Sequence, residues 1–175
     1  MITGLCEDKQ EVSNVISIFP YWKQTTIQDI VYIADTSPNI EEINSVNIVA
    51  NISNIKVIKT PKSQQIKTNG EVILSSNLEG KMMTGRKIII EGRLCQIIEY
   101  STSDPYDNLR SMTVYNPFSS YIVVPEMVDI NGEMIDALSV NFNVSACIEY
   151  LKAIVLDCRS ILESTVILFY AVPNV

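Results

Sequence analysis

The chain has 175 residues, of which 47% are apolar and only 19% are charged, and its formal net charge is −7 at pH 7. This length suits one domain with a sizeable core, while the acidity disfavours nucleic acid and anionic membrane surfaces as partners. The absence of histidine removes the commonest general base and metal ligand, so we expect no enzyme, no metal and no other cofactor.

The first segment, residues 1–20, has no strong periodicity and predicts an N-terminal arm or first strand ahead of one β domain at 21–175. It lacks the basic start and apolar run of a secretory signal. No stretch is apolar for long enough to predict a membrane-spanning helix. We therefore expect synthesis in the cytoplasm without membrane insertion. Helical turns are predicted near 27–34, after Thr26 as N-cap, and near 39–44, after Pro38.

From Val46 onward the pattern is that of strands. Apolar side chains recur at every second position, which is typical of strands with one buried face. The expected core faces are Val46, Ile48, Ala50 and Ile52; Ile88, Ile90, Leu94, Ile98 and Tyr100; and Met112, Val114, Phe118, Ile122 and Val124. Asn131-Gly132 predicts a tight hairpin turn. The sequence therefore indicates an all-β, antiparallel sandwich or barrel-like domain with one or two short helical turns near the N-terminus.

The two C-terminal strands differ in pattern. Residues 134–151 alternate, and the inward side chains are expected to be Leu138, Val140, Phe142, Val144, Ala146, Ile148 and Tyr150. Residues 165–172 are apolar on both faces, so this strand should lie between two layers or against a neighbouring subunit. Val166, Leu168 and Phe169 are therefore candidate assembly residues.

Three aromatic residues are candidates for a binding surface. Tyr21 and Trp22, beside Pro20, could form a platform for a sugar ring together with Tyr100. The other interpretation is that Tyr21 and Trp22 close the end of the β core, as aromatic residues next to a strand often do.

The four cysteines, Cys6, Cys95, Cys147 and Cys158, have none of the spacings of zinc or redox motifs. Free cysteines are commonly buried as small apolar residues, although Cys95 and Cys147 fall on the more polar faces of their strands. An arm carrying Cys6 could reach a neighbouring subunit and bond to Cys147 or Cys95 there. The alternative is that Cys6 is a free thiol in the arm.

Several segments in order resemble a known family. They are Lys56-Val-Ile-Lys-Thr-Pro61, Gly85-Arg-Lys-Ile-Ile-Ile-Glu-Gly92, Gln96-Ile-Ile-Glu-Tyr100 and the run from Asn116 to Pro125. Together they are similar to the SPOCS domain, the spore-coat assembly domain of clostridial SipL-like proteins and of many small single-domain relatives. The resemblance covers about residues 19–125 closely and offers no catalytic residues to carry over. The chain lacks the repeated domains and LysM-type module of SipL-like proteins, which favours a small building block.

The resemblance implies a structural protein of the spore coat, exosporium or spore surface. Such a protein would be made in the mother-cell cytoplasm and would act by self-assembly or by co-assembly with other coat or exosporium proteins. A low content of charged side chains also favours close contact between copies, as in a homo-oligomer or polymer. The alternative function is an envelope glycan- or peptide-binding module without catalysis.

Overall fold

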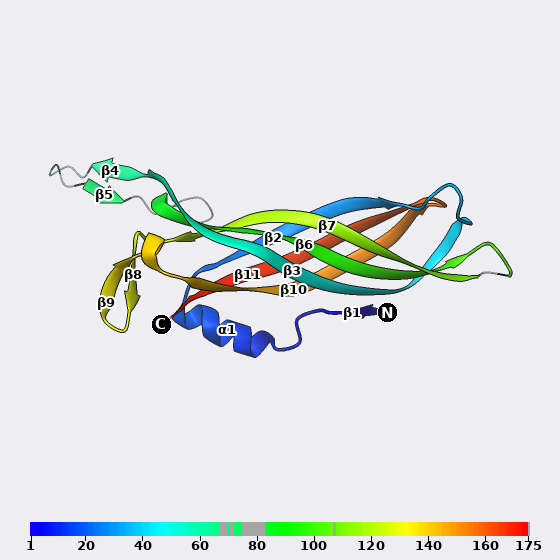
Figure 1. Cartoon of the computed structure of the whole chain (residues 1–175), viewed down its shortest axis with the longest axis horizontal. Coiled ribbons are helices and arrows are strands. Elements are labelled where there is room, and N and C mark those ends of the chain that lie inside the picture. Colours follow the sequence, from blue (N-terminus) through cyan, green and yellow to red (C-terminus); the bar gives the residue numbers. More distant parts are fainter. Residues whose placement is uncertain (67–69, 71, 75–82, 107, 175) are drawn as a thin grey trace.

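The computed structural model describes residues 1–66, 70, 72–74, 83–106 and 108–174. The protein is a β-sandwich of two mainly antiparallel sheets, drawn out along one axis (Figure 1). The elements in chain order are β1 (Ile2–Thr3), α1 (Lys9–Ile18), β2 (Trp22–Tyr32), β3 (Ile40–Lys62), β4 (Gln64–Ile66), β5 (Val72–Leu74), β6 (Thr84–Thr102), β7 (Leu109–Val124), β8 (Met127–Ile130), β9 (Glu133–Asp136), the 3-10 turn η1 (Ala137–Ser139), β10 (Phe142–Asp157) and β11 (Ser160–Pro173).

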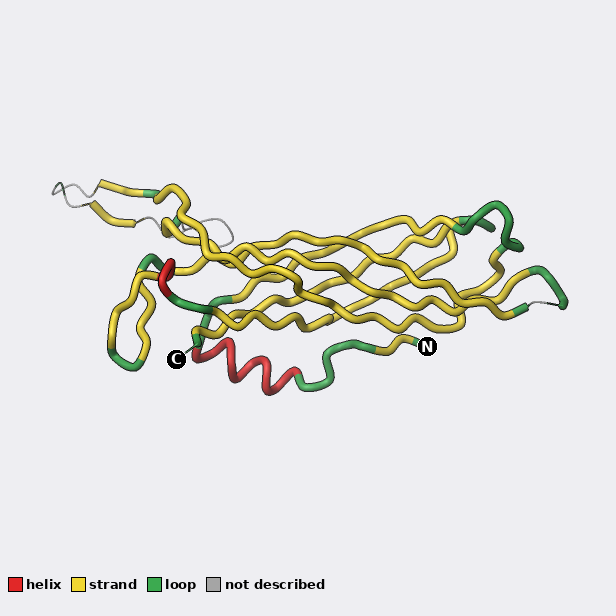
Figure 2. The backbone as a smooth tube through the Cα atoms, viewed as in Figure 1, coloured by secondary structure: helices red, strands yellow, loops and turns green. Residues whose placement is uncertain are grey.

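The larger sheet has the strand order β1-β3-β6-β7 and is called here the four-stranded sheet. The three-stranded sheet has the order β10-β11-β2. Strand β10 packs over β3, and β2 packs over β7. The hairpins β4–β5 and β8–β9 lie at one end of the sandwich (Figure 2). In the described part of the chain the sheets do not close into a barrel, so the mainly-β expectation is confirmed in its sandwich form.

The predicted core faces lie between the sheets, where most of their side chains are buried and others, such as Ala50 and Val114, are partly buried. Ile48, Ile88, Ile90 and Leu94 are fully buried, and Phe118 packs against Phe169 of the opposite sheet with tilted rings whose centroids are 5.2 Å apart. The turn at Asn131-Gly132 is also confirmed, since both residues have positive φ (55° and 85°) between the paired strands β8 and β9. That conformation is the one a two-residue hairpin with right-handed strand twist requires.

The predicted helical turns near 27–34 and 39–44 are wrong. Thr25 to Tyr32 belong to β2 and pair with β11, while Ile40 and the residues after it begin β3 and pair with β6. β-branched residues such as Thr25, Thr26 and Ile27 favour a strand once a neighbouring strand is available. The capping and proline signals were local, and the sheet partners overrode them.

The helix lies instead in the arm. Asp8 is the N-cap of α1, and its carboxylate accepts the Glu11 N–H at 2.8 Å. Val12 and Ile16, four residues apart, form the apolar stripe that faces the sandwich. An Asp followed three residues later by Glu is a helix-start signal, so α1 could have been predicted from the sequence.

Two residues predicted to face inward from the last long alternation lie outside. Leu138 is in the η1 turn and is 46% exposed. An irregularity between Ile148 and Tyr150 shifts the pairing of β10 with β11, which leaves Tyr150 exposed and buries Leu151. A bulge inserts one residue and reverses the alternation beyond it.

Candidate interaction surfaces

Strand β11 is central in its sheet and is covered along its inner side, while its outer side, which its apolar sequence predicted to be buried as well, is covered only in part. Its inward side chains, among them Ile167 and Phe169, are fully buried against the four-stranded sheet. On the outer side, Leu168 is buried in a small cluster with Val12 of α1 and Cys147. The second layer is therefore the protein's own helix over this part of the strand, while Val166 and Tyr170 remain partly exposed.

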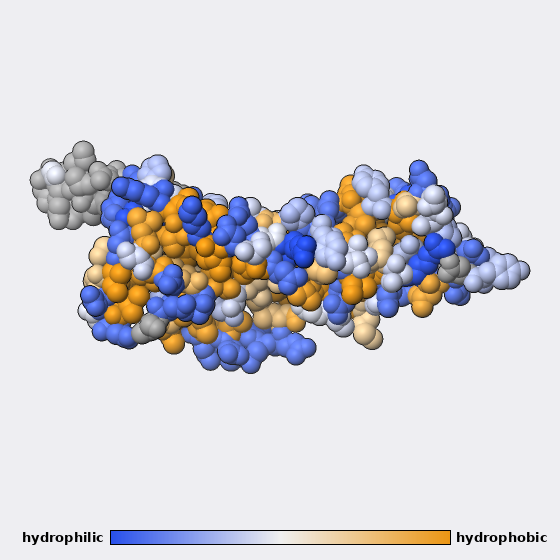
Figure 3. Space-filling model, in the orientation of Figure 1, coloured by the Kyte–Doolittle hydropathy of each residue, from blue (hydrophilic) through white to orange (hydrophobic). Residues whose placement is uncertain are grey.

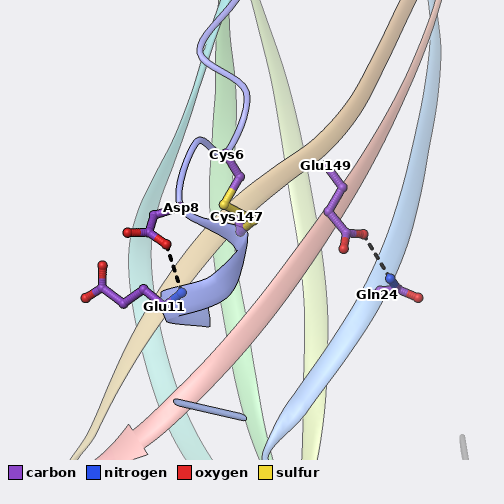
Figure 4. The surroundings of a disulfide bond; sticks show 6 residues. All are labelled: Cys6, Asp8, Glu11, Gln24, Cys147 and Glu149. Carbon is purple, nitrogen blue, oxygen red and sulfur yellow. Dashed lines mark hydrogen bonds between the residues drawn. A yellow bond between two sulfur atoms is a disulfide. The ribbon is translucent and has the colours of Figure 1, made fainter. Parts of the chain in front are cut away.

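The N-terminal arm is fastened across both sheets. β1 pairs parallel with β3, so it extends the four-stranded sheet. The Cys6 N–H then donates to Ile148 O of β10 at 2.9 Å, and Cys6 forms a disulfide with Cys147 of the same strand (Figure 4). The bond predicted between neighbouring subunits thus lies within one chain here, joining residues 141 positions apart. Cys95 and Cys158 are free thiols.

One apolar surface lies on the part of the three-stranded sheet that α1 leaves open. It is called here the β10 patch, and its exposed members are Ile30, Tyr32, Tyr150, Ile154 and Leu156. Ile30 and Ile154 stand in one cross-strand row with Leu162 between them. Side chains in one row of a sheet touch one another and form a continuous surface. This row is therefore an apolar strip across the sheet, while the polar row of Lys152, Ser164 and Gln28 separates it from Tyr150.

A second apolar surface lies on the outer face of the four-stranded sheet. It is called here the β6 patch and consists of Val49, Ile97 and Tyr115, all close to half exposed. Val49 and Tyr115 flank Cys95 in one cross-strand row. The Arg93 guanidinium lies 5.0 Å from the centre of the Tyr115 ring. The two patches point away from each other, because the two sheets meet through their inner faces.

Apolar side chains are also exposed at the end of the sandwich that carries the β8–β9 hairpin, where Figure 3 shows the broadest hydrophobic area of this view. Met83, Met127, Met134 and Leu138 are each between 39% and 57% exposed. Methionine adapts its shape to different partners, and exposed methionine clusters are typical of adaptable binding surfaces.

A charged cluster holds that hairpin against the sandwich. The buried Arg86 guanidinium donates to both carboxylate oxygens of Asp136, at 2.9 and 2.7 Å. Glu126 lies 3.3 Å from the same guanidinium and also pairs with Lys62. The Arg86 bonds, aided by the Leu138 N–H, lower the pKa of Asp136 to about 2. This paired geometry indicates a structural cluster.

A groove of about 610 Å³ opens between the edge strands β2 and β7. Its walls come from residues 29–34 and 110–115, with Tyr100 and Ser37 completing the lining. Tyr32 and Tyr115, at its rim, are 74% and 56% exposed. The opposite side of the sandwich carries the N-terminal arm.

The core beside this groove contains an unusual pair of polar side chains, Glu163 and Gln96. Glu163 on β11 is 1% exposed and pairs in register with Asp29 of the groove wall, and Gln96 on β6 is 0% exposed and pairs with Val114 of the opposite wall. Neither Glu163 oxygen has a hydrogen-bond partner, and neither polar atom of the Gln96 amide has one.

Burial raises the pKa of Glu163 to about 7. The negative charge of Asp29 adds to this rise, while the nearby amides of Gln96 and Asn116 offset part of it. A buried carboxylate without partners is costly when charged, so the proton is held far more tightly than in water. The alternation predicted the core faces around both residues, and the polar interruptions at Gln96 and Glu163 were the signal that was missed.

The three aromatic residues predicted as a binding surface are not brought together. Trp22 is half exposed and pairs with Tyr170 at one end of β2, while Tyr21 packs edge-on against Phe142 at 6.2 Å. Burial raises the pKa of the Tyr21 hydroxyl, and the charge of Asp129 raises it further. Tyr100 is buried and lines the groove beside the other end of β2, about 30 Å along the strand.

No chemical site of another kind stands out in the part of the chain that the structure describes. No three side chains among its cysteines, aspartates and glutamates lie together in a way that could hold a metal ion. No helix in these residues is long and apolar enough to cross a membrane.

No protein-family model, curated protein or solved structure matches the chain.

Proposed function

We propose that the protein is a structural subunit that assembles with copies of itself or with related proteins. The observation that carries this proposal is the pair of apolar patches on opposite outer faces of one sandwich. Exposed contiguous apolar surface commonly marks a protein interaction site. Two different patches on opposite faces allow each subunit to contact two neighbours, and a contact between unlike patches produces an open-ended chain or layer.

The size of the patches sets how such an assembly would hold together. A stable pairwise interface buries about 800 Å² per partner, which is more than a few half-exposed side chains supply. The polar residues around each patch must therefore take part, and each single contact would be weak. In a polymer every subunit is held through two or more contacts at once, and avidity makes the whole stable.

The proposed place of this assembly is the coat, exosporium or surface of a bacterial spore. This part of the proposal rests on the resemblance of residues 19–125 to the SPOCS domain. The subunit would be made in the mother-cell cytoplasm and join copies of itself or other coat proteins. It would work without cofactor or catalysis.

The test is the size distribution of the purified protein, measured by light scattering and negative-stain electron microscopy. We expect sheets, filaments or large oligomers from the parent chain. Ile154→Asp puts a charge in the β10 patch and should shift the protein to small dispersed particles. Ser145→Asp is the matched control, since Ser145 is exposed on the same strand but outside the patch. Dispersed monomers from the parent, or equal assembly of all three chains, would refute the proposal.

The groove between β2 and β7 favours a second candidate function, the binding of an envelope glycan or peptide without catalysis. Three tyrosines, Tyr32, Tyr100 and Tyr115, line it, and aromatic rings beside polar groups are common in sites for such ligands. Calorimetric titration with soluble peptidoglycan fragments and short peptides tests this function. Binding that is lost in Tyr115→Ala would support it, and no heat with any probe would exclude it for these ligands.

A further inference from the structure

The N-terminal arm (residues 1–18) lies along the outside of the sandwich and is fastened to it at several points. β1 contributes two paired residues, and the Val46 N–H donates to Met1 O at 2.8 Å. The Asn47 amide donates to the Thr3 hydroxyl at 2.9 Å. The Met1 amine also donates to Asn44 O, and the arm is held further by Leu5 at the main core, by the Cys6 contacts with β10 and by the apolar stripe of α1.

The place where the arm lies is a shaped docking site, called here the seam, between β3 and β10. Gly4 has φ of +89°, and a β-carbon there would lie 1.9 Å from Ile48 O of β3. The backbone at Gly4 therefore lies so close to β3 that no residue with a side chain would fit there. Leu5 packs against the main core, and Val12 is buried on Leu168 and Cys147. The seam thus recognises this arm sequence in particular.

The connection between the arm and the sandwich is short. α1 ends at Ile18, and its final turn is closed by the Phe19 N–H donating to Val15 O. Tyr21 is already anchored, because the Ala171 N–H donates to its carbonyl oxygen at 2.8 Å. Phe19 and Pro20 therefore form the connection, which is a tight turn because the Tyr21 N–H donates to Phe19 O at 2.7 Å. A rotation there would carry the arm away from its own seam while β2 stays in place, and short hinges of this kind favour exchange of an element between copies.

We infer that the arm of one chain docks in the seam of a second copy, and that a disulfide between Cys6 of the first chain and Cys147 of the second then fixes the two together. This inference rests on the proposed assembly function. A chain made in a reducing cytoplasm carries both cysteines as thiols, so the arm is then held by non-covalent contacts alone. Concentrating the chain in an assembly places many neighbouring seams within reach of each arm.

The covalent step is a thiol–disulfide exchange with a low-molecular-weight disulfide as oxidant. The Cys6 thiolate attacks that disulfide, forms a mixed disulfide and releases one small thiol. The Cys147 thiolate then attacks the Cys6 sulfur and releases the second small thiol. Two protein thiols are oxidised to one bond while the oxidant is reduced to two thiols. The same chemistry forms the disulfide within one chain or between two chains, according to which seam the arm occupies.

The test uses two chains that each keep one cysteine. The donor chain keeps Cys6 and has serine in place of the other three cysteines. The acceptor chain keeps Cys147 and has serine at Cys6, Cys95 and Cys158. The two are mixed in reductant at assembling concentration and then oxidised with glutathione disulfide. We expect a mixed dimer on a non-reducing gel, identified by mass, that exceeds the like-with-like dimers.

A matched acceptor keeps only Cys95, which lies on the outer face of the four-stranded sheet away from the seam. It should give little mixed dimer with the donor. Equal yields from both acceptors, or no mixed dimer with the Cys147 acceptor, would overturn the inference. Light scattering of the same mixtures in reductant reports assembly separately. Large particles without the mixed dimer would thus refute arm exchange and leave the proposed function standing.

Discussion

Replacing Glu163 by Gln should stabilise the protein above neutral pH, which is unusual for the loss of a charged residue. Glu163 is 1% exposed and its carboxylate oxygens have no hydrogen-bond partner. Its pKa is about 7 in the folded protein, against 4.5 for an unperturbed glutamate. A raised folded pKa means that the native state binds the proton more tightly. The native state therefore loses stability as pH rises from about 4.5 through about 7.

The size of the effect follows from the shift. About 2.5 pKa units correspond to about 3 kcal/mol of unfolding free energy at full ionisation. About 2 kcal/mol of this stability is lost between pH 5.5 and pH 8.5. That pH range also avoids the isoelectric point near 4.6, where proteins tend to precipitate. Glu163→Gln keeps the shape and cannot ionise. Its stability relative to the parent should therefore rise by about 2 kcal/mol between pH 5.5 and pH 8.5.

Urea denaturation followed by circular dichroism at several pH values, on protein dispersed by Ile154→Asp, measures this difference. Glu133→Gln is the control, since Glu133 is exposed on the β8–β9 hairpin, and it should track the parent at every pH. A parent that gains stability with rising pH relative to Glu163→Gln would refute the reasoning. A constant difference across the range would do so as well, because ionisation of Glu163 would then contribute nothing.

Three further outcomes are expected. Ile167→Asp buries an unpaired charge at a fully buried position of the central strand β11, so it should cost about 4 kcal/mol or more and abolish cooperative unfolding at pH 7; an unchanged melting midpoint would contradict this. Asp136→Asn weakens both bonds to Arg86 and should speed amide hydrogen exchange in the β8–β9 hairpin while sparing β6; uniform exchange would speak against a local role. Gly4→Ala places a β-carbon against Ile48 O, so labelling should detect more free Cys6 thiol under mild oxidation, with little change in the sandwich; complete disulfide formation would show that the fit at Gly4 is not limiting.

Period-two alternation predicted most of this fold because it reflects which side of a strand meets the core. Ile88, Ile90 and Leu94 are buried as expected, and so is Ile122 of the partner strand. The positions of helix were not predicted, because Thr26 and Pro38 carry local signals that sheet pairing overrides. Tyr150 was misplaced because a bulge is a property of two paired strands, and one sequence taken alone does not reveal it.

The candidate sites were less predictable, since they depend on contacts between distant segments. Cys6 and Cys147 are 141 residues apart, and their pairing requires the arm to lie along the β3–β10 seam. Whether Cys6 bonds within its chain or to a neighbour depends on the fold of the arm and on how copies meet. The buried partner of Asp29, Glu163, likewise becomes visible only once β2 is placed beside β11.

The proposed assembly would also account for the distribution of polar and apolar groups in this chain. Glu163 and Gln96 occupy core positions where leucine or isoleucine would leave no polar atom without a hydrogen bond. Ile30, Ile154 and Tyr115 lie exposed where polar residues would serve a monomer better. Each square ångström of apolar surface removed from water contributes about 25 cal/mol, so covering the two patches in an assembly supplies free energy that the isolated sandwich forgoes. The sandwich alone should therefore be modestly stable, and it should gain stability with protein concentration.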